Sequence, residues 1–68
     1  MTERLANRLK EQRTELGLTQ AELAEKVGVT RKTVNTVENG VFVPSTLLAI
    51  KLAAALDLSV EKLFWIER

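Results

Sequence analysis

Apolar residues recur along the chain at the spacing of amphipathic helices, and glycine, proline and capping residues separate the segments. No segment shows a convincing strand pattern. The pattern therefore predicts an all-α fold of five helices, at about residues 3–16, 19–28, 30–39 and 45–57, with a short fifth helix after Ser59.

The second predicted helix has the clearest boundaries. Thr19 and Glu22 have the T-x-x-E spacing of a capping box, and Leu18 and Leu23 have the spacing of a hydrophobic staple. Gly28 is a natural C-terminal stop. The box, the staple and the glycine all indicate the same helix boundaries, at Thr19 and Gly28.

The third predicted helix repeats this design. Thr30 is its expected N-cap, and Val29 and Val34 again have the staple spacing. Val34 and Val37 supply only a narrow apolar stripe before the helix ends at Asn39-Gly40. Its remaining polar positions cannot all face inward, so they must form an outward surface.

The last third of the chain is the most apolar. The fourth predicted helix contains TLLAIKLAAAL and is apolar nearly all round, so we expect it in the middle of a small bundle. The chain then ends in LFWIER, where an apolar cluster lies in an otherwise polar tail. Such a cluster needs cover from its own chain or from a partner.

The composition narrows the function classes. The chain has 68 residues, and we expect residues 1–68 to form a single domain. It has no Cys and no His, which argues against disulfides, zinc–thiolate sites and histidine-based catalysis, and no glycine-rich loop resembles a phosphate cradle. We therefore expect no enzyme activity, no metal and no cofactor.

Charge and hydropathy bear on location and partner. No apolar run approaches the roughly 20 residues of a membrane span, and the charged N-terminus lacks the apolar core of a secretory signal, so we expect a cytoplasmic protein. The net charge is only +1, but residues 26–51 hold four basic residues and one acidic residue. Taken alone, this local excess fits chance as well as it fits an anionic partner.

Only Gly28, Val29 and Thr30 separate the second and third helices, which is the spacing of a helix-turn-helix. The major groove of B-DNA admits a helix, and Arg, Lys and Thr side chains suit the edges of its bases. Hydroxyls and amides near helix ends also suit phosphate. Without the turn, a solvated face would be the better interpretation; with it, we expect the third helix to contact DNA.

The stretch LGLTQAELAEKVGVTRKTVNTVENG resembles the core of the Cro/CI-type repressors, also called XRE-like regulators. The matching elements are L-G-L-T-Q, A-E-L-A, the V-G-V-T turn and V-E-N-G. The resemblance covers about residues 4–63. It implies a five-helix, lambda-repressor-like DNA-binding domain with its helix-turn-helix at about residues 19–39, and no effector domain for a small molecule is evident.

The resemblance also implies roles for individual residues. The base-reading positions are matched by Arg31, Lys32 and Thr36, flanked by Thr33 and Asn35. Phosphate contacts are expected from Gln20, Thr30, Asn39 and Arg13. Arg13 and Glu38 match a pair whose salt bridge holds the first helix to the end of the third. Several family members have glutamines where this chain has Arg31 and Lys32, so we expect a different preference, for guanine.

A single recognition helix reads few base pairs, so we expect a homodimer on a palindromic operator, acting as a repressor. Residues 58–68 are the candidate dimerisation tail, with Leu63, Phe64, Trp65 and Ile66 as its interface. The competing interpretation is that these side chains complete the core of their own chain. An antitoxin or a protein-interaction adaptor with the same fold also stays open, as does a designed variant, which would explain the regular capping.

Overall fold

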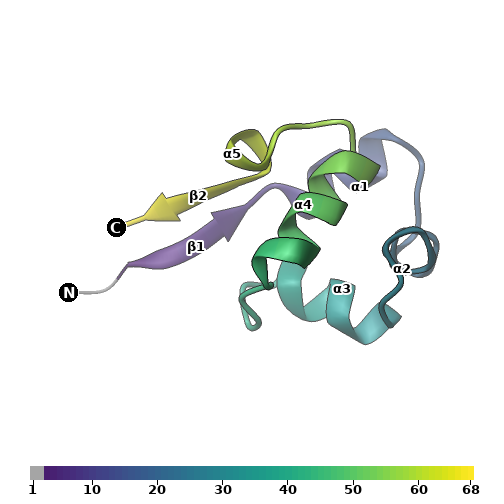
Figure 1. Cartoon of the computed structure of the whole chain (residues 1–68), viewed down its shortest axis with the longest axis horizontal. Helices are drawn as coiled ribbons and strands as arrows, with labels where there is room; N and C mark the ends of the chain where they lie inside the picture. Colours follow the sequence, from purple (N-terminus) through teal and green to yellow (C-terminus); the bar gives the residue numbers. More distant parts are fainter. Residues whose placement is uncertain (1–2) are drawn as a thin grey trace.

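The computed structural model describes residues 3–68, and Met1 and Thr2 of the predicted domain lie outside the described residues. Within residues 3–68, five helices form a bundle, and two strands form an antiparallel ribbon that projects from it (Figure 1). The whole measures 36 × 21 × 20 Å. In chain order the elements are β1 (Arg4–Asn7), α1 (Leu9–Glu15), α2 (Gln20–Val27), α3 (Arg31–Glu38), α4 (Thr46–Ala55), α5 (Val60–Leu63) and β2 (Phe64–Glu67).

The predicted capping box at the start of α2 is confirmed. The Glu22 N–H donates to the Thr19 hydroxyl at 3.0 Å, and the Thr19 N–H donates to the Glu22 carboxylate at 2.8 Å. The second bond lowers the pKa of Glu22, because it favours the ionised carboxylate. At the other end, Gly28 adopts φ +76°, the left-handed conformation that glycine enters without steric cost.

Two further helices begin at hydroxyl caps, at about the starts that the sequence predicts. The Thr30 hydroxyl accepts from the Thr33 N–H at 3.2 Å at the start of α3. The Ser45 hydroxyl accepts from the Leu48 N–H at 3.1 Å at the start of α4. These bonds satisfy amide donors that a helix leaves unpaired at its first turn.

The prediction of a helix from residue 3 and the absence of strands were wrong. Residues 4–7 form β1, which pairs with β2 in the register Arg4↔Glu67 to Asn7↔Phe64. The helix begins only at Leu9, where the Asn7 side-chain oxygen accepts from the Leu9 N–H at 2.9 Å. Local periodicity missed the strand because its partner lies at the opposite end of the chain.

The core lies between the helices and includes side chains from all of them, with Leu9, Leu23, Val34, Val37, Leu52, Leu56 and Leu63 fully buried. The expectation that α4 lies in the middle of the bundle is corrected, because Leu52 and Ala53 are buried but Leu47 and Ile50 are exposed on its outer face. A bundle this small covers only one side of the helix. Neither α4 nor any other helix in residues 3–68 is long and apolar enough to cross a lipid bilayer.

Candidate nucleic-acid interface

The turn between α2 and α3 has the predicted length and is fixed by its backbone. The Val29 N–H donates to the Ala24 carbonyl at 3.0 Å, and the Gly28 N–H donates to the Glu25 carbonyl at 3.3 Å. Beyond the turn, α3 packs against α2 and buries Val34 and Val37. The opposite face of α3 is thereby directed to solvent (Figure 1).

The outward face of α3 is basic at its N-terminal end. Arg31, Lys32 and Asn35 are exposed, and Thr33 and Thr36 are partly buried. The first turn of α3 has no acidic residue, although the helix dipole favours negative charge there. The positive charges of Arg31 and Lys32 lower the stability of the helix at this end, but they form a surface suited to an anionic ligand.

Asn35 has a fixed orientation on this face. Its side-chain Oδ1 accepts from the Gln20 Nε2 at 3.1 Å and from the Asn39 Nδ2 at 3.2 Å. An amide oxygen has two acceptor positions, and these two donors occupy them. The group that Asn35 presents outward is therefore its Nδ2, a donor only.

Gln20 connects the start of α2 to α3. Its Nε2 donates to Asn35 Oδ1 and also to Glu38 Oε1 at 3.0 Å. Both amide hydrogens are thus directed at α3, so the side chain buttresses that helix. To contact phosphate through the same amide, Gln20 would have to give up one of these bonds.

The expected ion pair of Arg13 and Glu38 is present and nearly buried, with 10% and 3% of the two side chains exposed. The Arg13 Nε donates to Glu38 Oε2 at 2.6 Å, and its Nη1 donates to the Leu18 carbonyl at 2.8 Å. The expectation that Arg13 also contacts phosphate is corrected here, because its guanidinium is enclosed and engaged within the protein. Arg13 instead connects α1 and the loop before α2 to the end of α3.

Thr30 and Asn39 lie exposed at the two ends of α3. The Thr30 hydroxyl already caps the helix and lies 3.1 Å from the Thr33 hydroxyl. The backbone N–H of Asn39 donates to the Asn35 carbonyl at 3.1 Å, and its side-chain amide donates to Asn35. Both residues therefore lie at the edge of the exposed face of α3, and each already makes hydrogen bonds within the protein.

The predicted dimerisation tail divides into buried and exposed parts. The assignment of Leu63 and Phe64 to an interface is corrected, because both side chains are buried in the core of their own chain. Trp65 and Ile66 are not part of that core and are 39% and 61% exposed. The alternation of a strand explains the difference between Phe64 and Trp65.

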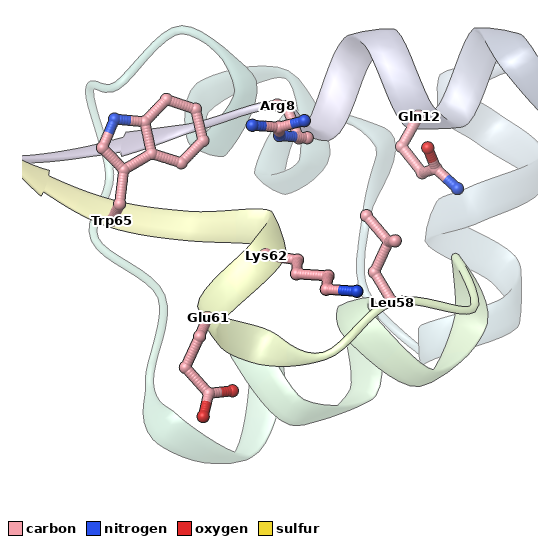
Figure 2. Close-up of a pocket in the computed structure, with 6 residues that line it drawn as sticks. All are labelled: Arg8, Gln12, Leu58, Glu61, Lys62 and Trp65. Carbon is pink, nitrogen blue, oxygen red and sulfur yellow. The ribbon is translucent and has the colours of Figure 1, made fainter.

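Trp65 forms one wall of a surface groove of about 490 Å³ (Figure 2). The Arg8 guanidinium carbon lies 5.3 Å from the centroid of the Trp65 ring, within the range of a cation–π contact. The rest of the lining comes from α1, α5 and the segment before α5, through Gln12, Leu58, Glu61 and Lys62.

Val41 and Phe42, in the turn that follows α3, are not among the site residues predicted from the sequence. They are exposed and line a hollow together with Lys32, Thr33 and Thr36. The sequence feature that could have identified them is the apolar run V-F-V between Gly40 and Pro44, because such a run is unusual in an exposed turn.

The chain matches known proteins over most of its length. A helix-turn-helix family model matches residues 9–63. An uncharacterised helix-turn-helix-type transcriptional regulator of Bacillus subtilis, YgzD, is 46% identical over 63 residues, which cover 93% of this chain and 96% of the relative.

Solved structures agree with this match. The restriction-modification controller protein C.AhdI of Aeromonas hydrophila superposes with a TM-score of 0.76 at 42% identity, covering 81% of this chain and 83% of that one. The biofilm master regulator SinR of Bacillus subtilis, solved in complex with DNA, superposes with a TM-score of 0.72 at 39% identity, covering 78% of this chain and 86% of that one. These proteins are regulators and not enzymes, and the chain belongs to their family, the Cro/CI-type (XRE-like) helix-turn-helix transcriptional regulators.

Proposed function

We propose that this regulator binds double-stranded DNA by inserting the exposed face of α3 into the major groove. It does so as a homodimer on a palindromic operator and represses transcription by blocking the promoter there. The observation that best supports this proposal is the exposed basic end of α3, formed by Arg31 and Lys32. The helix that carries them is held in place by a network of hydrogen bonds from Arg13 and Gln20 to Glu38.

The network matters because base reading requires side chains to be presented in a fixed geometry. Arg13 and Gln20 both donate to Glu38, the last residue of α3, from two different helical segments. Gln20 also fixes Asn35 in the middle of the face. The helix can therefore enter the groove with little loss of conformational entropy.

Each exposed side chain suits a different group on DNA. Arg31 and Lys32 suit the N7 and O6 acceptors of guanine. Asn35 offers only its Nδ2 donor, so it suits an acceptor such as N7 or the thymine O4. Thr36 donates its hydroxyl to the Thr33 carbonyl at 2.9 Å, which leaves its methyl group and oxygen for the groove.

Phosphate contacts position the protein without reading sequence. We assign them to Thr30 and Asn39, at the two ends of the exposed face of α3, and to the backbone N–H of Gln20 in the first turn of α2. The Gln20 side-chain amide stays engaged with α3. The helix dipole makes the starts of α2 and α3 favourable places for phosphate. These contacts make the affinity fall steeply as salt increases.

The homodimer is supported by the projecting ribbon. A two-stranded ribbon is marginal by itself, and this one exposes Trp65 and Ile66 near the end of the chain. A two-fold interface through these side chains would cover them and double the recognition surface. Half-sites in such dimers lie about one helical turn of DNA apart, roughly 34 Å.

The relatives support regulation of transcription in a prokaryotic cell, where DNA lies in the cytoplasm. YgzD, C.AhdI and SinR are all proteins of bacteria. We therefore place the protein in the cytoplasm with duplex DNA as its partner.

The test is selection of bound sequences from a random duplex DNA library. The wild-type protein is expected to enrich a palindromic motif, and the Arg31→Ala/Lys32→Ala variant to lose it while keeping its helical circular dichroism spectrum. A wild-type protein that enriches nothing at low salt would overturn the proposal and favour a protein partner, as in an adaptor.

A further inference from the structure

The turn after α3 folds back over the recognition helix. The backbone N–H groups of Val41 and Phe42 donate to the Thr36 carbonyl, at 2.9 and 3.2 Å. This arrangement fixes the turn against the C-terminal half of α3. Val41 is nevertheless 78% exposed, so its side chain is held at the surface and not tucked into the core.

Val41 and Phe42 line a hollow together with residues of the exposed face of α3. The other residues that line this hollow are Lys32, Thr33 and Thr36. Lys32 has an aliphatic stem and each threonine has a methyl group, and the surface that lines the hollow is mostly apolar. An apolar pocket thus lies directly beside two of the proposed base-reading side chains.

Exposed Val41 and Phe42 side chains keep apolar surface in water, which is unfavourable in free energy. Beside a face that binds a polyanion, this surface is stabilised only if an apolar group of the ligand packs against it. The major groove of DNA offers one such group that depends on sequence, the C5-methyl of thymine. A protein partner seated in this hollow would have to displace DNA from Lys32 and Thr36, so DNA is the compatible occupant.

We propose that Val41 and Phe42, together with the methyl groups of Thr33 and Thr36, form a site that reads a thymine C5-methyl group. The inference rests on the proposed function, because it requires α3 to lie in the major groove. It adds the turn 41–42 to the specificity-determining residues and predicts a thymine next to the base pairs that Lys32 and Thr36 contact.

The test replaces each thymine of the selected operator with deoxyuridine, which removes only the methyl group. For the wild-type protein, one position is expected to lose affinity by about four-fold, the effect of one buried methyl-sized group. With Val41→Ala, the same replacement is expected to change the affinity by less than it does for the wild type, because one of the side chains around the methyl group is then missing.

Val43→Ala is the matched control. Val43 is the same residue type in the same turn and is 67% exposed, but it lines a different hollow, with β1, Phe42 and Phe64. This variant is expected to keep the full deoxyuridine effect. Phe42→Ala provides a second probe, and circular dichroism verifies the fold of all three variants.

Two results would overturn the inference while leaving base reading intact: an operator without a thymine whose methyl group affects binding, or a deoxyuridine effect that is equal in the wild-type, Val41→Ala and Val43→Ala proteins. Failure of the proposed function is different, since the wild-type protein would then select no sequence at all.

Discussion

The Arg13 Nε lies 2.6 Å from Glu38 Oε2, in an ion pair that joins the end of the recognition helix to α1. Both side chains are nearly excluded from water, and Gln20 donates to the other Glu38 oxygen at 3.0 Å. The carboxylate therefore stabilises the fold and fixes the direction of α3.

Glu38→Ala is expected to lower the free energy of unfolding by about 3–5 kcal/mol, because Arg13 would be left as a buried charge without a partner. Arg13→Met/Glu38→Leu is expected to recover most of this loss, since it removes both charges and keeps the volume. Urea unfolding followed by circular dichroism measures both values. A loss below about 1 kcal/mol for Glu38→Ala would show that the pair contributes little.

Asn35→Asp is expected to keep the fold, because a carboxylate can still accept from Gln20 and Asn39. It removes the outward donor and adds a negative charge opposite DNA, so the operator affinity should fall more than ten-fold. Asn35→Ala, which removes the donor without adding charge, should cause a smaller loss. Fluorescence anisotropy gives both affinities, and an unchanged affinity for the aspartate variant would exclude Asn35 from the interface.

The capping box makes stability depend on pH through Glu22. Its pKa lies below the ordinary value of 4.5, chiefly because the Thr19 N–H donates to the carboxylate. The stabilisation is therefore fully present above about pH 4.5 and is lost as the pH falls through the lower pKa of the folded state.

Thermal unfolding of the wild type and Glu22→Gln between pH 2.5 and 7 tests this dependence. The wild type should be the more stable at pH 7, and the difference should shrink below about pH 4.5, the ordinary pKa. Glu25→Gln, at an exposed position of the same helix, is the control. A difference between wild type and Glu22→Gln that does not vary with pH would contradict the role of the box.

Trp65→Ala is expected to shift the protein from dimer to monomer, because it removes the largest exposed side chain of the ribbon. Sedimentation equilibrium at micromolar concentration measures the state. Leu47→Ala, an exposed apolar position on α4, should leave the dimer intact. A wild-type protein that is already monomeric at this concentration would contradict the proposed dimer.

Local sequence signals were sufficient for the starts of α2, α3 and α4, because a cap and its partner lie within three residues of each other. They were insufficient for β1, whose pairing of Arg4 with Glu67 spans nearly the whole chain. Asn7 did carry a local signal for the true start of α1, since asparagine side chains readily bond an amide two residues on.

The same limit applies to the candidate site. The exposed positions of α3 follow from its narrow apolar stripe, so Arg31, Lys32 and Asn35 were predictable as surface residues. The burial of Arg13 and Phe64 depends on tertiary packing that no local pattern reports. The hollow at Val41 likewise depends on the turn folding back onto Thr36.

The most direct test of base reading by α3 is a titration of the wild type and Arg31→Ala against two operators. One is the selected operator, and in the other 7-deazaguanine replaces the guanine predicted opposite Arg31, which removes the N7 acceptor. The wild type should lose about 2- to 12-fold in affinity on this replacement, roughly half the free energy of a bidentate contact, and Arg31→Ala should be nearly indifferent to it. Equal discrimination by both proteins would contradict the central claim.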